Sequence, residues 1–454
     1  MCERDTIAAL ASGAGRAGIG VVRVSGPDAL ALGRRLTGRT LAPRRAHFVR
    51  FRDGDGQVLD DGLAIAFPGP ASFTGEDVVE LHGHGNPVLL QALLDRLYAL
   101  GARPARPGEF SERAFLAGRL DLAQAEAVAD LVAAGSLAAA RAARRSLDGV
   151  FSRQVHELLD ALVAVRVEVE AGIDFPEEEL ELLAGGALAG RLDAARRRLA
   201  ALLAAARHGQ RLRDGQVVVL AGRPNAGKSS LLNRLAGSER AIVTPVPGTT
   251  RDVLREEIRL GEVGLTLVDT AGLREAGDAI EAEGVRRARA ELARADHVLQ
   301  VCDAADPASV PDAGLAPALA GDAGLTVVLN KIDLLAADAR AAALARAAAG
   351  GGTVLAVSAQ TGEGIDALIV HLARLAGATG AGEGAFSARA RHVEALQRTA
   401  ARLDDAYRHL VDEQAFELCA EALRLAHLAL GEITGAHTPD DLLGAIFSSF
   451  CIGK

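Results

Sequence analysis

One short run of residues has the composition and spacing of a phosphate-binding loop. Residues Gly222–Ser229 read GRPNAGKS and fit GxxxxGK[ST], between an expected strand at Val217–Leu220 and an expected helix at Ser230–Ala236. Glycines in such a loop let backbone N–H groups close around phosphates at the N-terminus of a helix. We expect Lys228 to contact the β- and γ-phosphates as a compact charge, and Ser229 to ligate Mg²⁺ through its hydroxyl.

A second run predicts which base the nucleotide carries. Residues Asn330–Asp333 read NKID and follow an expected strand at Thr326–Leu329. Asp333 can accept hydrogen bonds from the ring N–H and the exocyclic amine of guanine, whereas adenine would leave this carboxylate unpaired, at roughly 1–3 kcal/mol per mismatch. Lys331 would lay its stem along the base, and Ser358–Gln360 would offer a backbone N–H to the guanine oxygen.

Two further runs complete a set in the order typical of a translation-factor-type GTPase. Residues Gly248–Asp252 (GTTRD) provide Thr250 as a second hydroxyl for Mg²⁺. Residues Asp269–Gly272 (DTAG) provide the Asp269 carboxylate on the metal side and an N–H for the γ-phosphate. The expected GTP contacts are Asn225, Ala226, Gly227, Lys228, Ser229, Ser230, Thr244, Pro245, Val246, Pro247, Gly248, Thr249, Thr250, Asp269, Thr270, Ala271, Gly272, Asn330, Lys331, Asp333, Ser358, Ala359 and Gln360.

The residue after DTAG departs from the pattern of many small GTPases, which have a water-orienting Gln there. Leu273 occupies this position and cannot orient water. Either hydrolysis is negligible or another group supplies the role. The acids downstream are Glu275, Asp278, Glu281 and Glu283, and their spacing alone does not choose among them.

Composition excludes several classes of protein. The 454 residues include 50 Lys+Arg and 59 Asp+Glu, for a net charge of −9, so a strongly basic coat protein for nucleic acid is excluded, although a local RNA-binding face is not. Only three of the 50 basic residues are lysine: Lys228, Lys331 and Lys454. No apolar run is long enough to span a bilayer, and Met1–Asp5 leads into no signal peptide. Four cysteines without a CxxC pair indicate a reduced, cytoplasmic setting and no zinc site.

The elements expected to position these residues change in type along the chain. Short apolar runs predict strands at Ile19–Val24, Leu63–Phe67 and Val78–Leu81, and the spacing predicts a helix over Val88–Leu100. Further strands are expected at Val217–Leu220, Leu265–Val268, Val298–Val301, Thr326–Leu329 and Val354–Val357, with helices between them. The expected domains are an α+β domain at 1–118, a helical domain at 119–212 and 375–454, and a parallel, doubly wound α/β domain at 213–374 inserted into it.

Several runs outside the nucleotide motifs match one known family. They are Asp5–Ile7, Gly15–Arg16, Arg23–Gly26, Phe73–Asp77, Pro107–Phe110, Arg113–Leu116, Asp121–Ala127, Asp269–Glu275 (DTAGLRE) and the ending Phe447–Lys454 (FSSFCIGK). Together with the inserted GTPase domain they make the chain resemble the MnmE (TrmE) family of tRNA-modification GTPases over essentially its whole length.

The resemblance implies an activity and partners. The family is a homodimer joined through its N-terminal domains, where it binds 5-formyl- or 5,10-methylene-tetrahydrofolate. With an FAD-dependent partner, MnmG (GidA), it forms a heterotetramer that adds an aminomethyl or carboxymethylaminomethyl group to carbon 5 of the tRNA wobble uridine. Its GTPase is activated by K⁺ and by dimerisation of the GTPase domains.

The resemblance also implies roles for particular residues. Glu281 would orient or activate the water, and Cys451 stands where the family has a cysteine with a proposed catalytic role. Arg119 stands where the family usually has a Lys that contacts folate, which preserves the charge but not the shape. The implied K⁺ ligands are Asn225, Thr244, Val246 and Thr249, and the other implied folate contacts are Arg23, Glu80 and Lys454.

Two other functions fit part of the sequence. One is a regulatory GTPase that assists ribosome or RNA assembly, and the other is a folate-dependent methyl-group enzyme with a regulatory domain. The N-terminal block and the tail Cys451–Lys454 argue against the first, because a pure switch needs neither.

Other candidate residues have plainer interpretations. The arginines within Arg191–Arg198 are expected to form a solvated helix face, and His82 and His84 to lie in a pocket wall or at the surface without a metal. Cys302 and Cys419 are expected in the core. For Cys451, the sequence leaves two interpretations open: a small buried hydrophobic residue or a reactive thiol.

Overall fold

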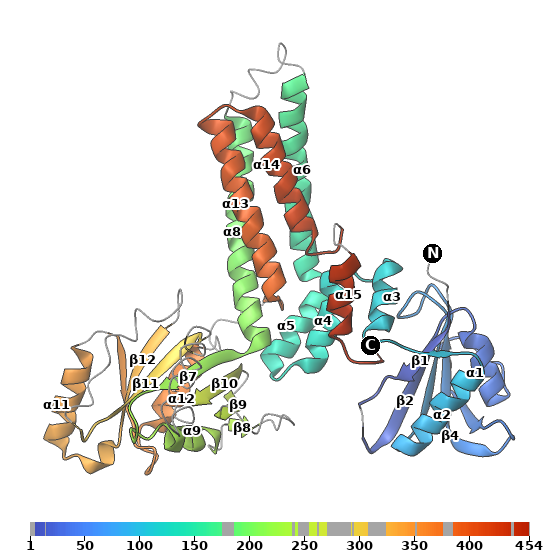
Figure 1. Cartoon of the computed structure of the whole chain (residues 1–454), viewed down its shortest axis with the longest axis horizontal. Coiled ribbons are helices and arrows are strands. Elements are labelled where there is room, and N and C mark those ends of the chain that lie inside the picture. The colour runs from blue at the N-terminus through green and yellow to red at the C-terminus, as the bar shows by residue number, and fades with distance from the viewer. Residues whose placement is uncertain are drawn as a thin grey trace, which may run out of the picture. The chain divides into compact units, whose positions relative to one another are not determined.

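The computed structural model describes most of the chain, in two compact units (Figure 1). The described residues are 5–13, 15–174, 186–237, 241–243, 254–260, 263–269, 292, 295–306, 324–349, 352–375, 385–436 and 440–453, with backbone only at 241–243, 254–257, 259–260, 263–264, 269 and 440. One unit comprises Met1–Ala129, Ser146–Leu202 and Glu394–Lys454, and the other comprises Asp130–Arg145 and Leu203–Val393.

The first unit contains a mixed sheet in the order β3-β4-β5-β2-β1-β6. Its strands are β1 Ile7–Leu10, β2 Ala17–Ser25, β3 His47–Arg52, β4 Val58–Phe67, β5 Val78–Gly85 and β6 Arg103–Pro104. All pairs are antiparallel except β1 with β6. The register places Arg23 of β2 beside Ala9 of β1 and Glu80 of β5.

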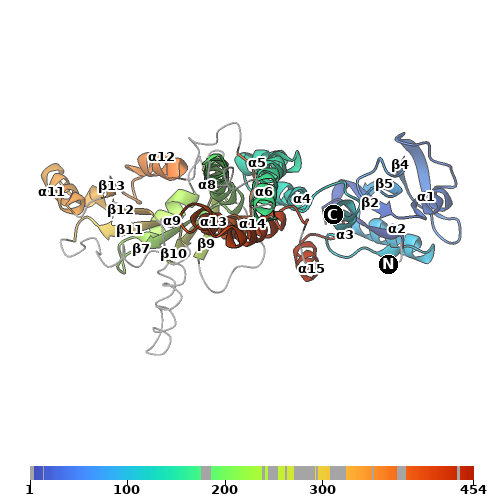
Figure 2. The ribbon, with the colours of Figure 1, turned by 90° about the horizontal axis from the view of Figure 1, so that it is seen from above.

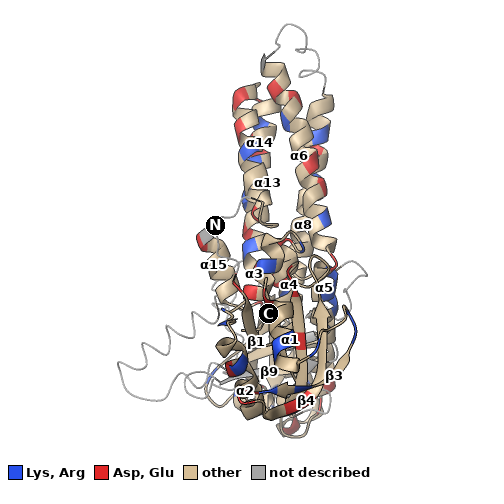
Figure 3. Cartoon of the chain, turned by 90° about the vertical axis from the view of Figure 1, so that its right-hand side faces the viewer, with Lys and Arg blue, Asp and Glu red and all other residues tan. Residues whose placement is uncertain are grey.

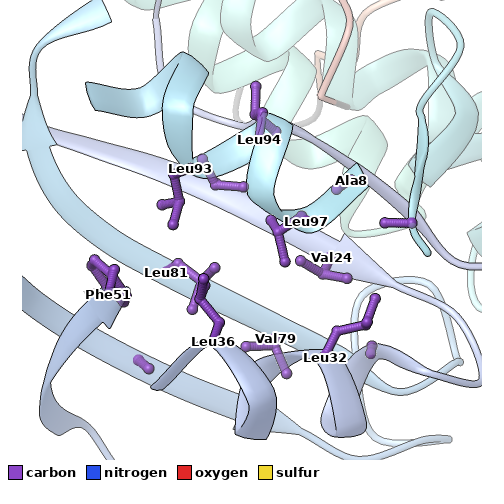
Figure 4. Close-up of a cluster of buried hydrophobic side chains, with 14 of the residues drawn as sticks. Ala8, Val24, Leu32, Leu36, Phe51, Val79, Leu81, Leu93, Leu94 and Leu97 are labelled. Atoms are coloured by element: carbon purple, nitrogen blue, oxygen red, sulfur yellow. The ribbon is translucent and has the colours of Figure 1, made fainter. Parts of the chain in front are cut away.

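Helices α1 (Ala29–Thr37) and α2 (Pro87–Ala99) cover one face of this sheet. Leu32 and Leu36 of α1 and Leu97 of α2 pack against strand residues such as Val24 and Leu81, all buried (Figure 4). Burying an aliphatic side chain stabilises a fold by roughly 1.5–3 kcal/mol. The chain contains no tryptophan, so this layer of aliphatic side chains stabilises the domain instead.

On the sheet's other face, Phe110 of α3 (Glu109–Leu116) packs with Phe73 and with Ile7 and Ala9 of β1. The side chains of β2 alternate between the two faces, so Arg23 points to the side opposite Val22 and Val24. The short α3 therefore lies on the same side of the sheet as Arg23, which is a predicted folate contact.

Further helices belong mostly to this unit. Their bounds are α4 Leu122–Ala133, α5 Leu137–Leu147, α6 Val150–Asp174, α8 Ala187–Asp214, α13 Ala390–Val411, α14 Phe416–Gly431 and α15 Asp440–Ser448, with α5 and the ends of α4, α8 and α13 assigned to the second unit. Arg196 pairs with Asp404 and stacks on Tyr407, so this member of the predicted solvated cluster serves helix packing.

The second unit contains a sheet in the order β13-β12-β11-β7-β10-β9-β8. Its strands are β7 Gln216–Ala221, β8 Ala241–Val243, β9 Leu254–Leu260, β10 Val263–Asp269, β11 His297–Asp303, β12 Gly324–Asn330 and β13 Thr353–Ala356. The sheet is parallel from β13 to β10, as expected, but β8 and β9 add an antiparallel edge on β10 that was not predicted. Residues Leu254–Leu260 read LREEIRL and carry too many charges to resemble a buried parallel strand.

Helices cover both faces of this sheet (Figure 2). α9 (Lys228–Ala236) and α12 (Ile365–Leu375) pack on one face against residues such as Leu220 and Val328. α11 (Ala337–Ala348) packs on the other face against residues such as Val327. The predicted doubly wound α/β fold, inserted in a helical domain behind an N-terminal α+β domain, is confirmed.

Each predicted strand lies in an observed one, to within a residue at the end of β13, but β1, β3, β6, β8 and β9 were not predicted. α9 begins two residues earlier than expected, because the left-handed Gly227 caps it. None of the helices that the structure describes is both long and apolar enough to cross a bilayer.

Candidate functional site

The loop between β7 and α9 has the backbone that the phosphate-binding motif predicts. Gly227 has φ 91° and a Cβ there would lie 2.2 Å from Asn330 Nδ2. Gly222 has φ 150° and a Cβ there would lie 2.2 Å from the Val301 carbonyl. Only glycine fits these two positions, because a side chain would be strained and would clash. Asn225 also has a left-handed φ of 61°, at the exposed tip of the loop.

Lys228 lies folded across this loop. Its ammonium donates hydrogen bonds of 2.9 Å to the carbonyls of Gly222 and Arg223, and the residue is only 5% exposed. Ser229 and Ser230 follow in the first turn of α9 and are exposed. The loop therefore concentrates a positive charge, backbone N–H groups and hydroxyls at one helix N-terminus, as a triphosphate with Mg²⁺ requires.

Asn330 joins the phosphate-binding loop to the Ser358–Gln360 loop. Its buried amide donates to the Ala226 carbonyl and accepts from the Ala359 N–H, both at 3.0 Å. This amide therefore holds the two loops in register and is satisfied on both sides before any base is bound.

Lys331 makes a second connection to the same loop. Its ammonium donates to the Asn225 carbonyl at 2.7 Å and pairs with Asp303 Oδ2 at 2.7 Å. Asp333 follows in the short 3-10 helix Ile332–Leu334, and it is exposed, as a carboxylate that receives guanine should be. The NKID run thus combines two positioning residues with one exposed acceptor.

Sequence reasoning missed Arg234, which also belongs to the site. From α9 its guanidinium donates to the carbonyls of Ala359 at 3.1 Å and Gln360 at 2.7 Å. Ser358 is fully buried, and its hydroxyl accepts the Thr361 N–H at 3.1 Å, which closes the turn. No sequence signal identifies Arg234, because its partners are backbone carbonyls more than a hundred residues away.

Part of the predicted nucleotide site lies outside the described residues. Asp269 ends β10 beside Leu220, and its side chain is not described. The other predicted residues outside the described ranges are Thr244, Pro245, Val246, Pro247, Gly248, Thr249, Thr250, Thr270, Ala271, Gly272 and Glu281. Leu273 lies there too.

A second group of predicted residues meets on the open face of the first unit's sheet. Arg23 donates to Glu80 Oε1 through Nε at 3.0 Å and Nη2 at 2.9 Å, and both side chains are 20% exposed. The Arg23 guanidinium lies 5.1 Å from the centroid of the Phe73 ring and 5.6 Å from that of Phe110. A fixed cation, an acceptor and two aromatic rings are thereby held together.

The loop that carries Phe73 is pinned by charged side chains. Glu76 accepts from Ser25 Oγ at 2.8 Å and pairs with Arg113 at 3.0 Å, and the Ser25 hydroxyl also bonds Thr74 at 2.7 Å. Burial alone would lower the pKa of Arg113, but its bonds to Glu76 and Glu109 outweigh burial and raise it. Phe73 therefore keeps its place over Arg23 through a partly buried ion pair.

The same network fixes the start of α3. Glu109, whose side chain is 3% exposed, accepts from Arg103 at 2.7 Å and from Arg113 at 3.0 Å. Burial opposes its ionisation, but hydrogen bonds from Arg103, the Arg106 N–H and Arg113 lower its pKa to about 2. A hydrogen bond from Arg103 likewise lowers the pKa of Asp5 to about 2.

The C-terminal tail docks beside these residues. Gly453 is buried with φ 97°, and a Cβ there would lie 2.0 Å from the carbonyl of Leu10, next to Ala9 that pairs with Arg23. The Cys451 carbonyl accepts the Gly108 N–H at 3.3 Å. Cys451 itself is exposed, which excludes the buried-hydrophobe alternative. Lys454 lies outside the described residues.

The remaining predicted residues have mixed surroundings. Arg119 is exposed, and its Cγ would lie 3.3 Å from a Cβ at Gly75, on the Phe73 loop. Cys302 and Cys419 are buried as predicted, and burial raises the pKa of Cys419 to about 11.

His82 and His84 lie near carboxylates. His82 Nε2 is 3.4 Å from Glu80 Oε2, and His84 Nδ1 is 2.7 Å from Asp60 Oδ1. Asp60, Asp61 and His84 each offer a ligand atom within 4.8 Å of the others. The Asp60 carboxylate already accepts the His84 ring, the His84 N–H and the Asp61 N–H, so it is satisfied by protein groups.

Fold and loops together define a P-loop GTPase domain inserted into a larger multidomain chain. Two family models match: "GTP-binding protein TrmE N-terminus" over residues 6–119 and "MnmE helical domain" over residues 122–451. The chain belongs to the MnmE family of tRNA-modification GTPases.

Three relatives called "tRNA modification GTPase MnmE" illustrate the similarity. The Xanthomonas campestris pv. campestris (strain B100) protein is 57% identical over 452 residues, covering 99% of both chains. The Alkalilimnicola ehrlichii protein is 55% identical over 451 residues, covering 99% of this chain and 100% of the relative. The Stutzerimonas stutzeri protein is 53% identical over 455 residues, covering 99% of both chains. Among solved structures, a variant of Aquifex aeolicus Era is 27% identical, covering 35% of this chain and 56% of that chain, with a TM-score of only 0.29.

Proposed function

We propose that this GTPase, with an FAD-dependent MnmG (GidA) partner, adds an aminomethyl or carboxymethylaminomethyl group to carbon 5 of the wobble uridine of certain tRNAs. The observation that carries the proposal is the presence of two sites in one chain. The chain has a guanine-nucleotide loop set and, separately, an Arg23–Glu80 site at which the C-terminal tail docks. A switch that only hydrolyses GTP needs no such second site.

Mass spectrometry of wobble uridines tests this function directly. A deletion strain should lack the modified uridine, and the wild-type gene should restore it. Unmodified uridine would accumulate in the deletion strain if the proposal holds. Unchanged tRNA would reject it and favour a regulatory GTPase that assists RNA assembly.

For the GTP step, we propose that Lys228 neutralises the β- and γ-phosphates while Ser229 and Thr250 ligate Mg²⁺ and Asp269 lies on the metal side. Asp333 would select guanine. The bonds from Asn330 to Ala226 and Ala359 support this assignment, because they hold the Ser358–Gln360 loop beside the phosphate-binding loop before the base arrives.

The second site is proposed to bind a one-carbon tetrahydrofolate through Arg23, Glu80, Arg119 and Lys454. When bound, that group would supply the carbon unit. The residues fit such a ligand, because Glu80 can accept N–H bonds of a pterin and the Phe73 and Phe110 rings border the pair. Titration with 5-formyl-tetrahydrofolate should give saturable binding to the wild type. Glu80→Gln should weaken it, and Glu112→Gln, on α3 and paired with Arg106, should not.

Cys451 is proposed to act in the modification chemistry. Its exposure within the docked tail supports this, since a reactive thiol has to be reached. Cys451→Ser should abolish wobble modification while leaving folate binding within a factor of about 2 of the wild-type affinity. A fully active Cys451→Ser chain would show that Cys451 takes no part in the modification chemistry.

Potassium activation is a separate proposal, with Asn225, Thr244, Val246 and Thr249 as the K⁺ ligands. A cation near the phosphates neutralises charge in a loose transition state, as an arginine finger does. The exposed, left-handed Asn225 at the loop tip supports it. GTP hydrolysis should be much faster in KCl than in NaCl, and equal rates would refute the assignment. Glu281→Ala should lower hydrolysis far more than GTP binding if Glu281 replaces the water-orienting Gln.

The assembly and domains follow the same proposal. We infer a cytoplasmic homodimer joined through the N-terminal domains, GTPase domains that dimerise during hydrolysis, and a heterotetramer with MnmG. Its domains would be 1–118, a helical domain of 119–212 and 375–454, and a GTPase domain of 213–374. Sedimentation of the chain alone and with the purified partner would measure both assemblies.

A further inference from the structure

The most basic segment of the chain lies at one edge of the N-terminal sheet. Residues Ala29–Arg52 contain seven arginines and no acid: Arg34, Arg35, Arg39, Arg44, Arg45, Arg50 and Arg52. We call these seven residues the arginine edge. Since the segment contributes +7 to a net charge of −9, the remainder of the chain carries −16.

The fold brings these arginines around a single strand. Arg34 and Arg35 lie in the last turn of α1, and Arg50 and Arg52 lie on the exposed side of β3, the terminal strand of the sheet. Arg39, Arg44 and Arg45 occupy the connection between α1 and β3. All seven side chains are exposed, and Figure 3 colours Lys and Arg blue in the elements labelled α1 and β3.

Many arginines elsewhere in the described part of the chain pair with acids. Arg103 pairs with Glu109, Arg398 with Glu432 and Arg196 with Asp404. Within the described part of the chain, no member of the arginine edge forms an ion pair. The acid next to it across the sheet is Asp61, opposite Arg50 in the register, while Asp60 is engaged by His84.

Structural roles account for only part of the set. Arg35 donates to the Leu100 carbonyl at 3.4 Å, Arg52 donates to the Gly56 carbonyl at 2.7 Å, and Arg44 donates to the Ala71 carbonyl. The C-terminus of α1 favours a cation in its last turn, which suits Arg34. Neither explanation covers Arg39 and Arg45, whose guanidinium groups make no hydrogen bond or ion pair to any residue that the structure describes.

We propose that the arginine edge is a docking surface for the phosphate backbone of tRNA. Guanidinium groups bind phosphates with two parallel hydrogen bonds, and several unpaired ones along an edge suit a folded RNA. The remainder of the chain is strongly negative, so this edge is a local positive potential on an acidic protein, which favours the approach of a phosphate backbone there. The inference rests on the proposed tRNA substrate but assigns a surface that neither the nucleotide site nor the folate site includes.

Salt-dependent tRNA binding of the full-length chain tests this. The double variant Arg39→Gln/Arg45→Gln should bind a tRNA transcript several-fold more weakly. The slope of log K against log [KCl] should decrease by about 1.4–1.8 in magnitude, because two phosphate contacts are lost. The control Arg207→Gln/Arg346→Gln removes the same charge from exposed positions on α8 and α11 and should keep the wild-type slope. Circular-dichroism melting curves should match for all three chains.

Three outcomes would overturn the docking surface. The first is an unchanged slope in Arg39→Gln/Arg45→Gln, and the second is an equal decrease in the control. The third is a double variant that loses binding to phosphatidylserine vesicles but keeps its tRNA affinity, which would indicate a membrane surface instead. A failure of the wobble-uridine assay would reject the substrate chemistry separately, because that assay does not measure affinity.

Discussion

The nucleotide loops and the Arg23–Glu80 site hold their functional residues by different forces. Around the nucleotide loops, Asn330, Lys331 and Arg234 bind backbone carbonyls and N–H groups of neighbouring loops. Around Arg23, the loop and helix are held by paired charges, chiefly Arg113 with Glu76 and Glu109. One site is therefore shaped mainly by hydrogen bonds to the main chain, and the other by ion pairs between side chains.

This difference has consequences for robustness. A side chain that binds main-chain atoms tolerates changes elsewhere in sequence, since every residue offers a carbonyl and nearly every residue an N–H. A partly buried ion pair depends on both partners, and the loss of one leaves an uncompensated charge. Single substitutions around the Arg23–Glu80 site should therefore act mainly on folding stability. Single substitutions in the nucleotide loops should act mainly on GTP binding and hydrolysis.

The largest expected effect is catalytic and separates the two sites completely. Lys228→Met should lower GTP hydrolysis by about 10²–10³-fold in single-turnover assays, because one cation facing the phosphates is lost in a site of low dielectric. Binding of 5-formyl-tetrahydrofolate should not change. Arg346→Met on the surface of α11 serves as the control, and a Lys228→Met chain with normal hydrolysis would contradict the site.

The next effect is on stability in the N-terminal sheet. Arg113 has a side chain that is 12% exposed, so Arg113→Leu should destabilise this region by about 3–5 kcal/mol, measured by hydrogen exchange of its peptides. Arg106→Leu removes a 64% exposed arginine that also pairs with Glu109 and should cost less than about 1 kcal/mol. Similar losses in both variants would show that the network does not depend on burial.

A smaller effect is expected in the nucleotide loops. Asn330→Ala removes one amide that joins two loops and should cost about 1–3 kcal/mol, weakening GTP binding about 5- to 150-fold. Exposed Asn233 on α9 offers a matched control in Asn233→Ala. Isothermal titration with a non-hydrolysable GTP analogue measures the loss, and equal affinities would mean that the loops hold their places without Asn330.

As pH falls, the two regions should lose stability at different pH values. Burial, reinforced by His371, lowers the pKa of His297 from 6.5 to about 4, and its ring bonds the Thr326 hydroxyl at 2.9 Å. A lowered pKa means that its contribution is complete above pH 6.5 and is lost as pH falls toward 4, by about 1–2 kcal/mol between pH 6.5 and 5. Glu109, with its pKa lowered from 4.5 to about 2, loses its contribution only between pH 4.5 and 2.

Hydrogen exchange followed against pH measures this order. Peptides of the α/β domain should lose protection before those around α3. His297→Gln should flatten the upper step while leaving the lower one. Simultaneous loss in both regions would show that the two units unfold together.

The predictable part of the molecule is the part encoded in contiguous residues. The strands ending at Ala221, Asn330 and Ala356 and the loops that follow were predictable, since a phosphate-binding loop and a base-reading loop each lie within a few residues. Strand β9, next to the terminal strand β8, was not predictable, because its charged residues remove the apolar run that signals a buried strand. Arg234 was not predictable either, since no motif relates it to Ala359.

The sequence by itself determined the nucleotide chemistry. Base choice, phosphate binding and the absence of a water-orienting Gln at Leu273 all follow from residue types at fixed short spacings. Only the tertiary structure decided how Arg23, Phe73, Phe110 and the tail meet, and that Cys451 is exposed while Gly453 is buried. The physical reason is that these contacts join positions far apart along the chain, so strand register and helix packing, rather than local spacing, bring the groups together.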